Sequence, residues 1–409
     1  MDPPQPDPDA ESCADLGHQE LGRGMEKKPV RRIRGCVMSL RILIVPDKFK
    51  GTLTARQAAA AIAKGWREVR PDDSIEELPM TDGGDGFGEV LGPMLKARRK
   101  TCVTVDSVGR AREAVWWLEP DTATAIVETA QVIGLALLPA GKYHPFQLDT
   151  FGIGAVFRQA KQAGARRLYA GLGGSSTNDG GFGLARSLGW KFLDARGTEL
   201  RMWTELDQLA RVEAPLQSVG FEELILAVDV ANPLLGAEGA SRIYGPQKGL
   251  GAGDLLKAEA CLGRLAEIMK TLTDEDFSLQ AGAGAAGGLG FGLKAFCGGT
   301  FQSGGDIFAT LSRLEQRIQE ADLILTAEGA LDAQTLMGKG VGVIAEAAAR
   351  AGKRCLCLAG SVSVDLLSVP WPNFKSYAIV PRIAPLAEAK AHADDCLRRL
   401  AIFAASEVH

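Results

Sequence analysis

The sequence predicts an α/β protein, and two observations support that prediction. Short apolar segments rich in β-branched residues alternate along the chain with alanine-rich or amphipathic helical segments, which is the order expected of parallel strands joined by helices. Several of these strands lead into a loop that holds glycine and a carboxylate. Because ligands of open α/β sheets bind at the carboxyl ends of the strands, we expect these loops to share one site.

Composition is typical of a globular chain with more than one domain. The chain has 409 residues, 46% of them hydrophobic, and a formal net charge of −4; at about 100–200 residues per domain, two or three domains are expected. The slightly acidic balance gives no support to nucleic-acid binding, and no apolar run reaches the roughly 18 residues of a membrane span. The cysteines are scattered without a Cys-x-x-Cys pair, so we expect a reduced, cytoplasmic protein.

Residues 1–38 differ in composition from the rest of the chain. A proline-rich, acidic start is followed by five basic residues between Lys27 and Arg34. Neither part can bury much apolar surface, so we predict a disordered extension. We expect neither a signal peptide nor a mitochondrial transit peptide, because an apolar centre is missing and acidic residues stand at the start. Met38 directly precedes the first predicted strand and is an alternative translation start.

The first part of the body reads as strand, helix, strand and helix. Residues 40–45 form a β-branched run that is typical of a buried parallel strand. An alanine-rich helix is predicted over 55–69, with Thr54 as its N-cap. A second strand over 75–78 leads to the loop 81–86, which is rich in glycine and aspartate and precedes another helix.

Near residue 100 the pattern changes to shorter alternating strands, which predicts a domain boundary. The strands predicted after it are 101–105, 112–117, 125–127, 167–170 and 223–228, and the helices are 153–163, 184–190 and 255–269. The α/β alternation then continues with strand 322–326, helix 343–351, strand 354–358 and a closing helix over 386–401.

The stretch Gly171–Gly183 is the densest polar motif, with six glycines and a Ser-Ser-Thr-Asn-Asp run in 13 residues. Between a strand and a helix, such a loop can turn its N–H groups toward an anion, and the helix N-terminus adds partial positive charge. Its hydroxyl groups can donate hydrogen bonds, and Asp179 can accept a proton or hold a metal. The alternative is a tight structural loop in which Asn178 and Asp179 form a turn and cap.

The segment Gly282–Gly292 contains a literal G-x-G-x-x-G. It is not interpreted as a dinucleotide fingerprint, because no convincing strand precedes it and no βαβ unit frames it. A backbone contact to phosphate or adenine and close helix packing are both open interpretations.

The glycine-containing loops together carry five carboxylates and three lysines that suit a phosphate ligand. The carboxylates are Asp47, Asp82, Asp179, Asp229 and Glu328, and the lysines are Lys50, Lys248 and Lys339. Magnesium bound by carboxylates and phosphates is the expected hard-ligand combination, and a lysine beside a glycine can neutralise phosphate charge; the alternative for each lysine is an exposed turn residue. Walker A and H-R-D motifs are absent, so a kinase of either of those groups is excluded.

Taken together, these loops resemble the glycerate kinase family of type 1. The segments that carry the resemblance, in the family's order, are 46–54, 82–86, 173–181, 229–236 with 245–249, 282–292 and the series from Glu328 to Lys339. The match runs from about residue 40 to the C-terminus. Lys48, Asp85 and Phe87 depart from the family's usual Ser, Glu and Thr, and residues 1–38 have no counterpart.

The resemblance implies a fold with two lobes. A discontinuous, flavodoxin-like α/β lobe is expected from the two ends of the body, with an inserted α/β lobe that resembles the restriction-endonuclease fold. The expected division is a disordered extension over 1–38, the first part of the flavodoxin-like lobe over 39–96, the inserted lobe over 97–281 and the second part over 282–409.

The resemblance also implies an activity, the ATP-dependent phosphorylation of D-glycerate with Mg²⁺. We expect 2-phosphoglycerate in preference to 3-phosphoglycerate. The alternatives are a kinase for a related small hydroxy acid and a non-catalytic regulator that binds a sugar acid or a nucleotide. No nucleic acid or membrane partner is expected, and both a monomer and a homodimer are open.

Each candidate residue is assigned one role in that chemistry. The catalytic candidates are Asp179, as the base, with Lys50 and Lys248. The substrate-binding candidates are Ser175, Thr177, Asn178 and Arg242. The cofactor-binding candidates are Gly173, Gly174, Gly284, Gly287, Gly288, Glu328, Asp332 and Lys339, and the metal ligands are Asp82 and Asp229.

Overall fold

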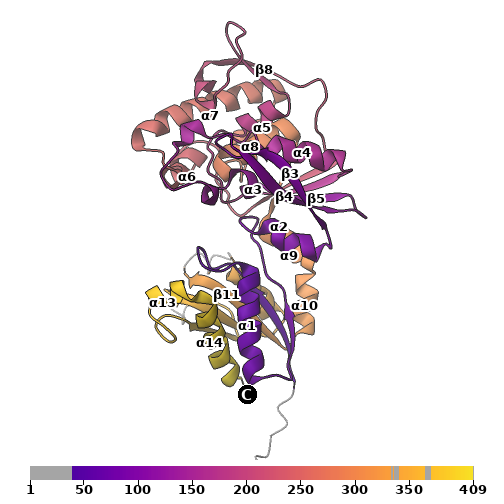
Figure 1. The fold of residues 1–409 in the computed structure, drawn as a ribbon, viewed down its shortest axis with the longest axis vertical. Coiled ribbons are helices and arrows are strands. Elements are labelled where there is room, and N and C mark those ends of the chain that lie inside the picture. Colours follow the sequence, from indigo (N-terminus) through magenta and orange to yellow (C-terminus); the bar gives the residue numbers. More distant parts are fainter. Residues whose placement is uncertain (1–38, 333–334, 336–339, 364–369, 409) are drawn as a thin grey trace, which may run out of the picture. The chain divides into compact units, whose positions relative to one another are not determined.

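The computed structural model describes residues 39–332, 335, 340–363 and 370–408. The predicted extension over 1–38 and the candidate Lys339 therefore lie outside the described residues. The described part is a mixed α/β structure with a five-stranded sheet, a six-stranded sheet and a two-stranded ribbon (Figure 1). This confirms the α/β fold class. The domain boundaries and the likeness to flavodoxin-like and restriction-endonuclease folds stay predictions.

The five-stranded sheet combines strands from both ends of the described chain. Its order is β13-β12-β11-β1-β2, and all neighbouring strands are parallel. The strands are β1 (Arg41–Pro46), β2 (Ser74–Glu77), β11 (Leu323–Leu331), β12 (Arg354–Val362) and β13 (Phe374–Ala378). Because β1 pairs with β11 with Pro46 opposite Ala327, Asp47 and Glu328 are placed side by side at the carboxyl edge.

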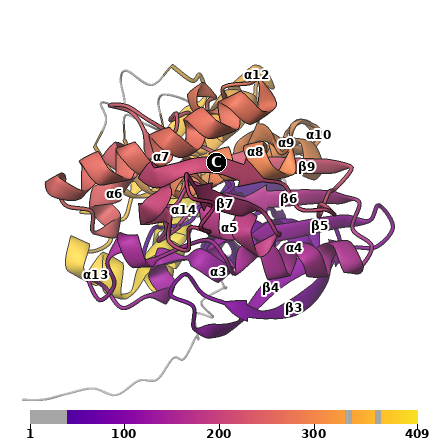
Figure 2. The same cartoon turned by 90° about the horizontal axis from the view of Figure 1, so that it is seen from above.

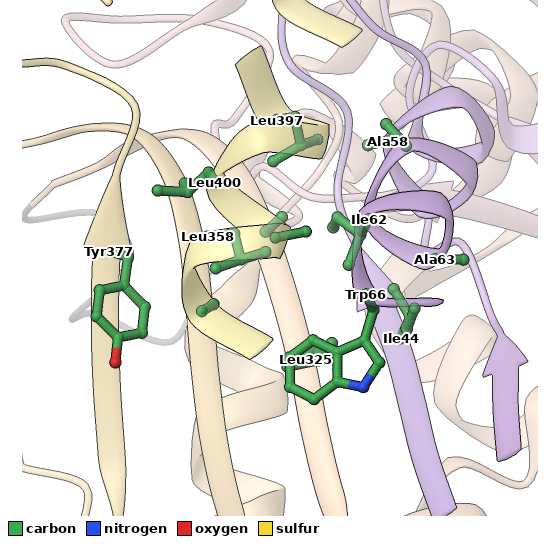
Figure 3. Close-up of a cluster of buried hydrophobic side chains, with 14 of the residues drawn as sticks. Ile44, Ala58, Ile62, Ala63, Trp66, Leu325, Leu358, Tyr377, Leu397 and Leu400 are labelled. Atoms are coloured by element: carbon green, nitrogen blue, oxygen red, sulfur yellow. The ribbon is translucent and has the colours of Figure 1, made fainter. Parts of the chain in front are cut away.

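Helices cover both faces of this sheet because both faces of its strands are apolar. Ile42 and Ile44 of β1 pack with α1 (Ala55–Val69) and α14 (Ala393–Ser406), while Leu43 and Val45 point to the opposite face. Helices α10 (Leu314–Glu320) and α12 (Val341–Arg350) cover that opposite face. Figure 3 shows the first of these clusters, in which Trp66, Leu397 and Leu400 meet the strand residues.

The six-stranded sheet has the order β10-β9-β6-β5-β4-β3 and is mixed. Strands β5, β6, β9 and β10 are parallel, whereas β3 and β4 extend the sheet as an antiparallel pair. Its strands are β3 (Arg98–Val105), β4 (Ala111–Glu119), β5 (Thr124–Glu128), β6 (Arg167–Gly171), β9 (Glu223–Val228) and β10 (Thr300–Ser303). Strands β7 (Lys191–Asp194) and β8 (Leu209–Glu213) form the separate antiparallel ribbon.

Each face of the six-stranded sheet has its own apolar cluster. One face packs against α2 (Phe87–Met94) and α9 (Gly304–Ser312), around Trp117 of β4. The other packs against α4 (Ile153–Gln162), α5 (Phe182–Ser187) and α8 (Ala285–Cys297) (Figure 2).

The shorter elements and the outer helices complete the fold. Helices α6 (Ala240–Lys248) and α7 (Ala252–Thr273) contribute to a further cluster with the β7–β8 ribbon. Within the described ranges, the remaining helices are α3 (Ala130–Ile133) and α13 (Leu386–Ala391), with 3-10 turns at Leu135–Leu137, Pro145–Gln147, Trp203–Gln208 and Phe277–Leu279. Among the described residues, no helix combines the length and apolar character needed to cross a membrane.

Most predicted elements are found, with one clear error near the end. Helix 55–69 is confirmed residue for residue, and Thr54 caps it through a capping box with Gln57. The single closing helix predicted over 386–401 is wrong. The chain breaks at His392, whose φ of −130° and ψ of 48° are not helical, and forms α13 and α14 instead.

Candidate functional site

Two cavities adjoin the carboxyl ends of the parallel strands. The larger has a volume of about 1130 Å³ and is lined by the start of the glycine loop, the segment around Leu135–Gln147 and the end of α6. The smaller has a volume of about 650 Å³ and is lined by residues that follow β1, by β11 and by α13. Of the described residues, Lys50 and Asp229 line both cavities. A cation and a carboxylate therefore stand where the two cavities meet.

The start of the glycine loop lines the larger cavity through Gly173, Gly174 and Ser175. The loop leaves β6 and returns to α5, as predicted. Gly174 has a φ of +62°, which favours glycine, and a Cβ atom there would lie 2.0 Å from Oδ1 of Asp85. Asp85 also lines this cavity, so a position that departs from the family pattern lies directly at the site.

Lys248, at the end of α6, is buried against the glycine loop and lines the larger cavity. Its Nζ atom donates to Oγ of Ser175 over 3.0 Å and to the carbonyl oxygen of Thr177 over 2.7 Å. Burial lowers the pKa of Lys248 to about 7, and the charge of Asp179 opposes this shift. The structure thus joins Lys248 to two candidates that lie 73 and 71 residues earlier in the sequence.

Asp179 is fully buried and lines neither cavity. Its Oδ2 atom accepts hydrogen bonds from the backbone and hydroxyl groups of Thr150 over 2.9 and 2.8 Å and from the N–H of Gly183 over 2.9 Å. Oδ1 accepts from Gly181 over 3.2 Å. Burial raises the pKa of Asp179 despite these bonds. This environment favours a loop-fixing role over the base role that the sequence suggested.

Thr177 and Asn178 are also fully buried and line neither cavity. Asn178 donates from Nδ2 to Oγ of Ser241 on α6 over 2.9 Å. The hydroxyl of Thr177 and Oδ1 of Asn178 are buried without a hydrogen-bond partner. Of the four substrate-binding candidates, Ser175 is thus the one that faces a cavity.

Several glycines of 282–292 pack closely against neighbouring backbone, and Gly287, Gly288 and Gly292 pack against the glycine loop. A Cβ atom at Gly287 would lie 1.9 Å from the carbonyl oxygen of Thr177, and one at Gly288 would lie 2.9 Å from Cα of Gly180. A Cβ atom at Gly284 would lie 2.3 Å from the carbonyl oxygen of Pro233. None of these three glycines lines either cavity, although Ala286 of the same segment lines the larger one. The glycines themselves therefore fit the packing interpretation.

The smaller cavity gathers most of the predicted loop carboxylates, together with Asp332. Burial raises the pKa of Asp47 to about 6, and repulsion from Asp82 adds to the shift. Burial also raises the pKa of Glu328 to about 7, with repulsion from Asp47 and Asp332, while Thr335 donates to its Oε1 over 2.7 Å. Asp47 had no role assigned from the sequence, although it follows its strand as the other carboxylates do.

Lys48 and Asp82 form an ion pair at the smaller cavity. Its Nζ atom lies 3.1 Å from Oδ1 and 3.4 Å from Oδ2 of Asp82, and both side chains are mostly buried. Burial alone would raise the pKa of Asp82, but attraction to Lys48 and the N–H of Gly84 lowers it.

The oxygen ligands of the smaller cavity fit a magnesium ion that is also held by phosphates. Asp47 and Asp82 lie close enough for the charge of Asp82 to raise the pKa of Asp47, and Mg²⁺ commonly takes one or two carboxylates beside substrate phosphates. No group of three or more His, Cys, Asp or Glu side chains in the described ranges could hold a metal by itself. The second metal candidate, Asp229, lines this cavity as well.

Arg242 and Lys339 are the remaining candidates. Arg242 lies on the exposed side of α6, with Nε 3.8 Å from Oε2 of Glu259, and lines neither cavity. Lys339 lies outside the described residues. Sequence reasoning also missed Glu128, a buried carboxylate at the end of β5; its place as the last residue of a strand was the available indication.

An α/β structure with a glycine loop, buried lysine and carboxylate-lined cavities at its strand ends has the features of a phosphotransferase. The model of the glycerate kinase family matches residues 42–408. The chain is 35% identical to glycerate 2-kinase of Escherichia coli K12, covering 88% of this chain and 96% of that protein. It is 36% identical to glycerate kinase of Bacillus subtilis 168, with the same shares of the two chains.

A solved structure agrees with these sequence matches. The crystal structure of a candidate glycerate kinase 2 from Salmonella typhimurium LT2 superposes with a TM-score of 0.73 at 31% identity, covering 90% of this chain and 98% of that one. The chain belongs to the glycerate kinase family, which confirms the resemblance predicted from the sequence.

Proposed function

We propose that this protein transfers the γ-phosphoryl group of ATP to the 2-hydroxyl group of D-glycerate, with Mg²⁺. The observation that supports this best is the junction of the two cavities at Lys50 and Asp229. Phosphoryl transfer requires two reactants in line, with charge neutralised between them. Two adjoining cavities with a lysine and an aspartate on their common wall fit that requirement.

The larger cavity is the better fit for the nucleotide. It offers Lys142 and Lys248 and the glycine loop, and its described carboxylates are Asp85 and Asp229. The smaller cavity is lined by more carboxylates, with Lys48 and Lys390 among its cations. Acidic side chains can accept hydrogen bonds from the hydroxyl groups of glycerate, and lysines can pair with its carboxylate. We therefore assign glycerate to the smaller cavity, where Glu328 and Asp332 become acceptor-binding residues.

Asp229 is the best-placed residue to accept the proton of the reacting hydroxyl. It lines both cavities and directly follows β9, whereas Asp179 is enclosed by its own loop. A carboxylate of ordinary basicity suffices, because in a loose transition state the hydroxyl loses its proton late. Lys50, on the same common wall, can neutralise charge on the transferred group.

Asp82 and Asp47 would hold the magnesium ion on the side of the smaller cavity that adjoins the larger one, because Asp47 lies within reach of the charge of Lys50 on the common wall. Bound there, the ion would neutralise phosphate charge and orient the γ-phosphoryl group. Lys48 would balance the remaining charge of Asp82, with which it is already paired. The glycine loop, braced by Lys248, would position the phosphates from the larger cavity.

A kinase for tartronate, hydroxypyruvate or another small hydroxy acid would use the same loops, and a non-catalytic binder would not turn over ATP. A coupled assay of ADP release against a panel of hydroxy acids separates these functions. We expect D-glycerate to give the highest kcat/KM, and an absence of ADP release with every acid would refute the proposal. A cytoplasmic location and a monomer or homodimer remain part of this proposal.

Calorimetric titration of ATP tests the metal. We expect affinity to fall when Mg²⁺ is removed with EDTA, because the carboxylates would repel the phosphates. Equal affinity with and without EDTA would count against a metal bridge.

A further inference from the structure

We propose that Glu128 is a positioning residue that fixes the loop Asp82–Gly86, so that Asp82 faces the smaller cavity and Asp85 the larger. This inference rests on the proposed function, because it assigns Glu128 a part in that reaction. Glu128 itself lines neither cavity, so it would act only through the two aspartates.

Glu128 holds the start of α2 with both carboxylate oxygens. Its Oε1 accepts from the N–H of Gly86 over 3.0 Å and its Oε2 from the N–H of Gly88 over 3.1 Å. Gly86 is the N-cap of α2 and has no side chain with which to cap the helix. A carboxylate that accepts the first N–H groups of a helix satisfies them and interacts favourably with the helix dipole. Glu128, at the end of strand β5, thus supplies the side-chain cap that Gly86 cannot provide.

The register of the six-stranded sheet places Glu128 level with the other site elements. Glu128 pairs with Gly171, where the glycine loop begins, and Gly171 pairs with Ala227, two residues before Asp229. The carboxyl edge of this sheet therefore positions the start of the glycine loop and Asp229 directly. It positions the loop Asp82–Gly86 through the hydrogen bonds of Glu128. Figure 1 shows α2 beside β5 and β4, and their side chains share one apolar cluster.

Neighbouring backbone also packs closely against the loop Asp82–Gly86. A Cβ atom at Gly173 would lie 2.5 Å from Cα of Gly84, and one at Gly83 would lie 3.0 Å from the carbonyl oxygen of Ala227. A Cβ atom at Gly304 of α9 would lie 2.1 Å from the carbonyl oxygen of Asp82. The loop thus packs against three backbone segments, and Glu128 links the sheet to its end by hydrogen bonds.

Stability alone does not explain a carboxylate at this place. Glu128 is 4% exposed, and burial raises its pKa, with repulsion from Asp85 and Glu89 opposing the two hydrogen bonds. A buried carboxylate close to like charges is costly. The arrangement does hold Asp85 beside Gly174 at the larger cavity.

The experiment compares Glu128→Gln with a matched control, Glu119→Gln. Glu119 is the last residue of the adjacent strand β4, is buried, and accepts the N–H groups of Asp121 and Thr122 over 2.8 and 2.7 Å. Like Glu128, it is the last residue of a strand, accepts two backbone N–H groups and lines neither cavity. In each variant, the new amide group would face a backbone N–H and lose one hydrogen bond, so both should lower Tm.

We expect Glu128→Gln to lower kcat by roughly 10- to 100-fold, because small displacements of positioning groups cost about that much. We expect Glu119→Gln to leave kcat within about threefold of wild type, as for a change outside the site. Hydrogen exchange of residues 82–88 should be faster in Glu128→Gln than in wild type or the control. Glu128→Asp, which keeps the charge on a shorter side chain, should give intermediate values and replaces Glu128→Gln if that variant does not fold.

An unchanged kcat in Glu128→Gln, or equal losses in both variants, would reduce Glu128 to a structural role and overturn the inference. Unchanged exchange of residues 82–88 would overturn it as well. Failure of the proposed function is distinguishable, because wild type would then release no ADP with any hydroxy acid, while the exchange measurement would still show whether Glu128 holds the loop.

Discussion

Lys248 donates a hydrogen bond from Nζ to Oγ of Ser175 over 3.0 Å, joining the end of α6 to the glycine loop. The same ammonium group also donates to the carbonyl oxygen of Thr177 over 2.7 Å. Because Ser175 lines the larger cavity and Thr177 does not, the lysine links the cavity-lining start of the loop to its buried middle. The conformation of the glycine loop is therefore connected, through these two hydrogen bonds, to the protonation state of Lys248.

Lys248→Met should change how stability depends on pH. The pKa of Lys248 is about 7 in the fold against 10.5 as its ordinary value, so between these values the unfolded chain binds a proton that the folded protein does not. Stability from this group therefore rises with pH across that window and is lost as pH falls through about 7. We expect the Tm deficit of Lys248→Met to be larger at pH 9 than at pH 6 in thermal denaturation.

The control is Lys257→Met on α7, where an exposed lysine pairs with Asp207 over 2.6 Å. Its Tm difference from wild type should vary little with pH over the same range. A deficit of Lys248→Met that is equal at both pH values would show that the lysine keeps its proton in the fold.

Asp229→Asn and Asp179→Asn should have different effects. Loss of a general base typically costs about 10²–10⁴-fold in rate, so Asp229→Asn should lower kcat by that order while nucleotide affinity stays near wild type. Asp179→Asn should chiefly lower Tm, because its amide group would face the N–H donors of Gly181 and Gly183. Steady-state kinetics, calorimetry and melting curves separate the two. A stable Asp179→Asn with a lost rate, beside an active Asp229→Asn, would restore the base role to Asp179.

Glu328→Gln should relieve a pH-dependent loss of stability. The pKa of Glu328 is raised from 4.5 to about 7, so its contribution to stability is full below about 4.5 and is lost as pH rises through about 7. The variant keeps the acceptor for Thr335 but cannot ionise. Relative to wild type, it should gain about 1–3 kcal/mol of unfolding free energy between pH 4.5 and pH 8.

Urea denaturation at the two pH values measures that difference. Glu346→Gln, an exposed position on α12, serves as the control and should show little pH-dependent gain. If Glu328→Gln behaves like this control, the carboxyl group is ionised in the fold at neutral pH.

Gly287→Ala tests the packing role of the second glycine segment. Gly287 has a φ of +70°, and the added Cβ atom would lie 1.9 Å from the carbonyl oxygen of Thr177, so we expect a loss of about 1–3 kcal/mol from backbone strain alone. Gly253→Ala in α7 meets nothing within 4 Å and should be neutral or stabilising by up to about 1 kcal/mol. A Gly287→Ala protein with wild-type Tm but weakened nucleotide binding would favour cofactor contact instead.

The sequence was sufficient for elements whose pattern is local. Residues 40–45 and 223–228 could be predicted as strands because short β-branched or leucine-rich runs bounded by polar residues are typical of buried strands. The start of the helix after Thr54 could be predicted because threonine is a common N-cap residue. The closing helix was predicted without its break because nothing in the side chains near His392 marks the non-helical backbone.

The site was harder to predict from the sequence, because the burial of a side chain and its distance from other side chains depend on the tertiary structure. The run around Asp179 has the composition of a ligand loop, yet backbone N–H groups of its own turn enclose the carboxylate. Arg242 was chosen for its charge, and only the fold shows that it faces away from both cavities. The placement of Lys50 and Asp229 together depends on two strands from different sheets, which no spacing in the sequence encodes.

The most direct test of the proposed function is identification of the product by phosphorus NMR. Wild-type protein incubated with ATP, Mg²⁺ and D-glycerate should yield ADP and a phosphomonoester whose phosphorus couples to the single C2 proton of 2-phosphoglycerate. Coupling to the two C3 protons would contradict the assigned hydroxyl group. The absence of any phosphoglycerate from a folded, nucleotide-binding protein would contradict the proposed function itself.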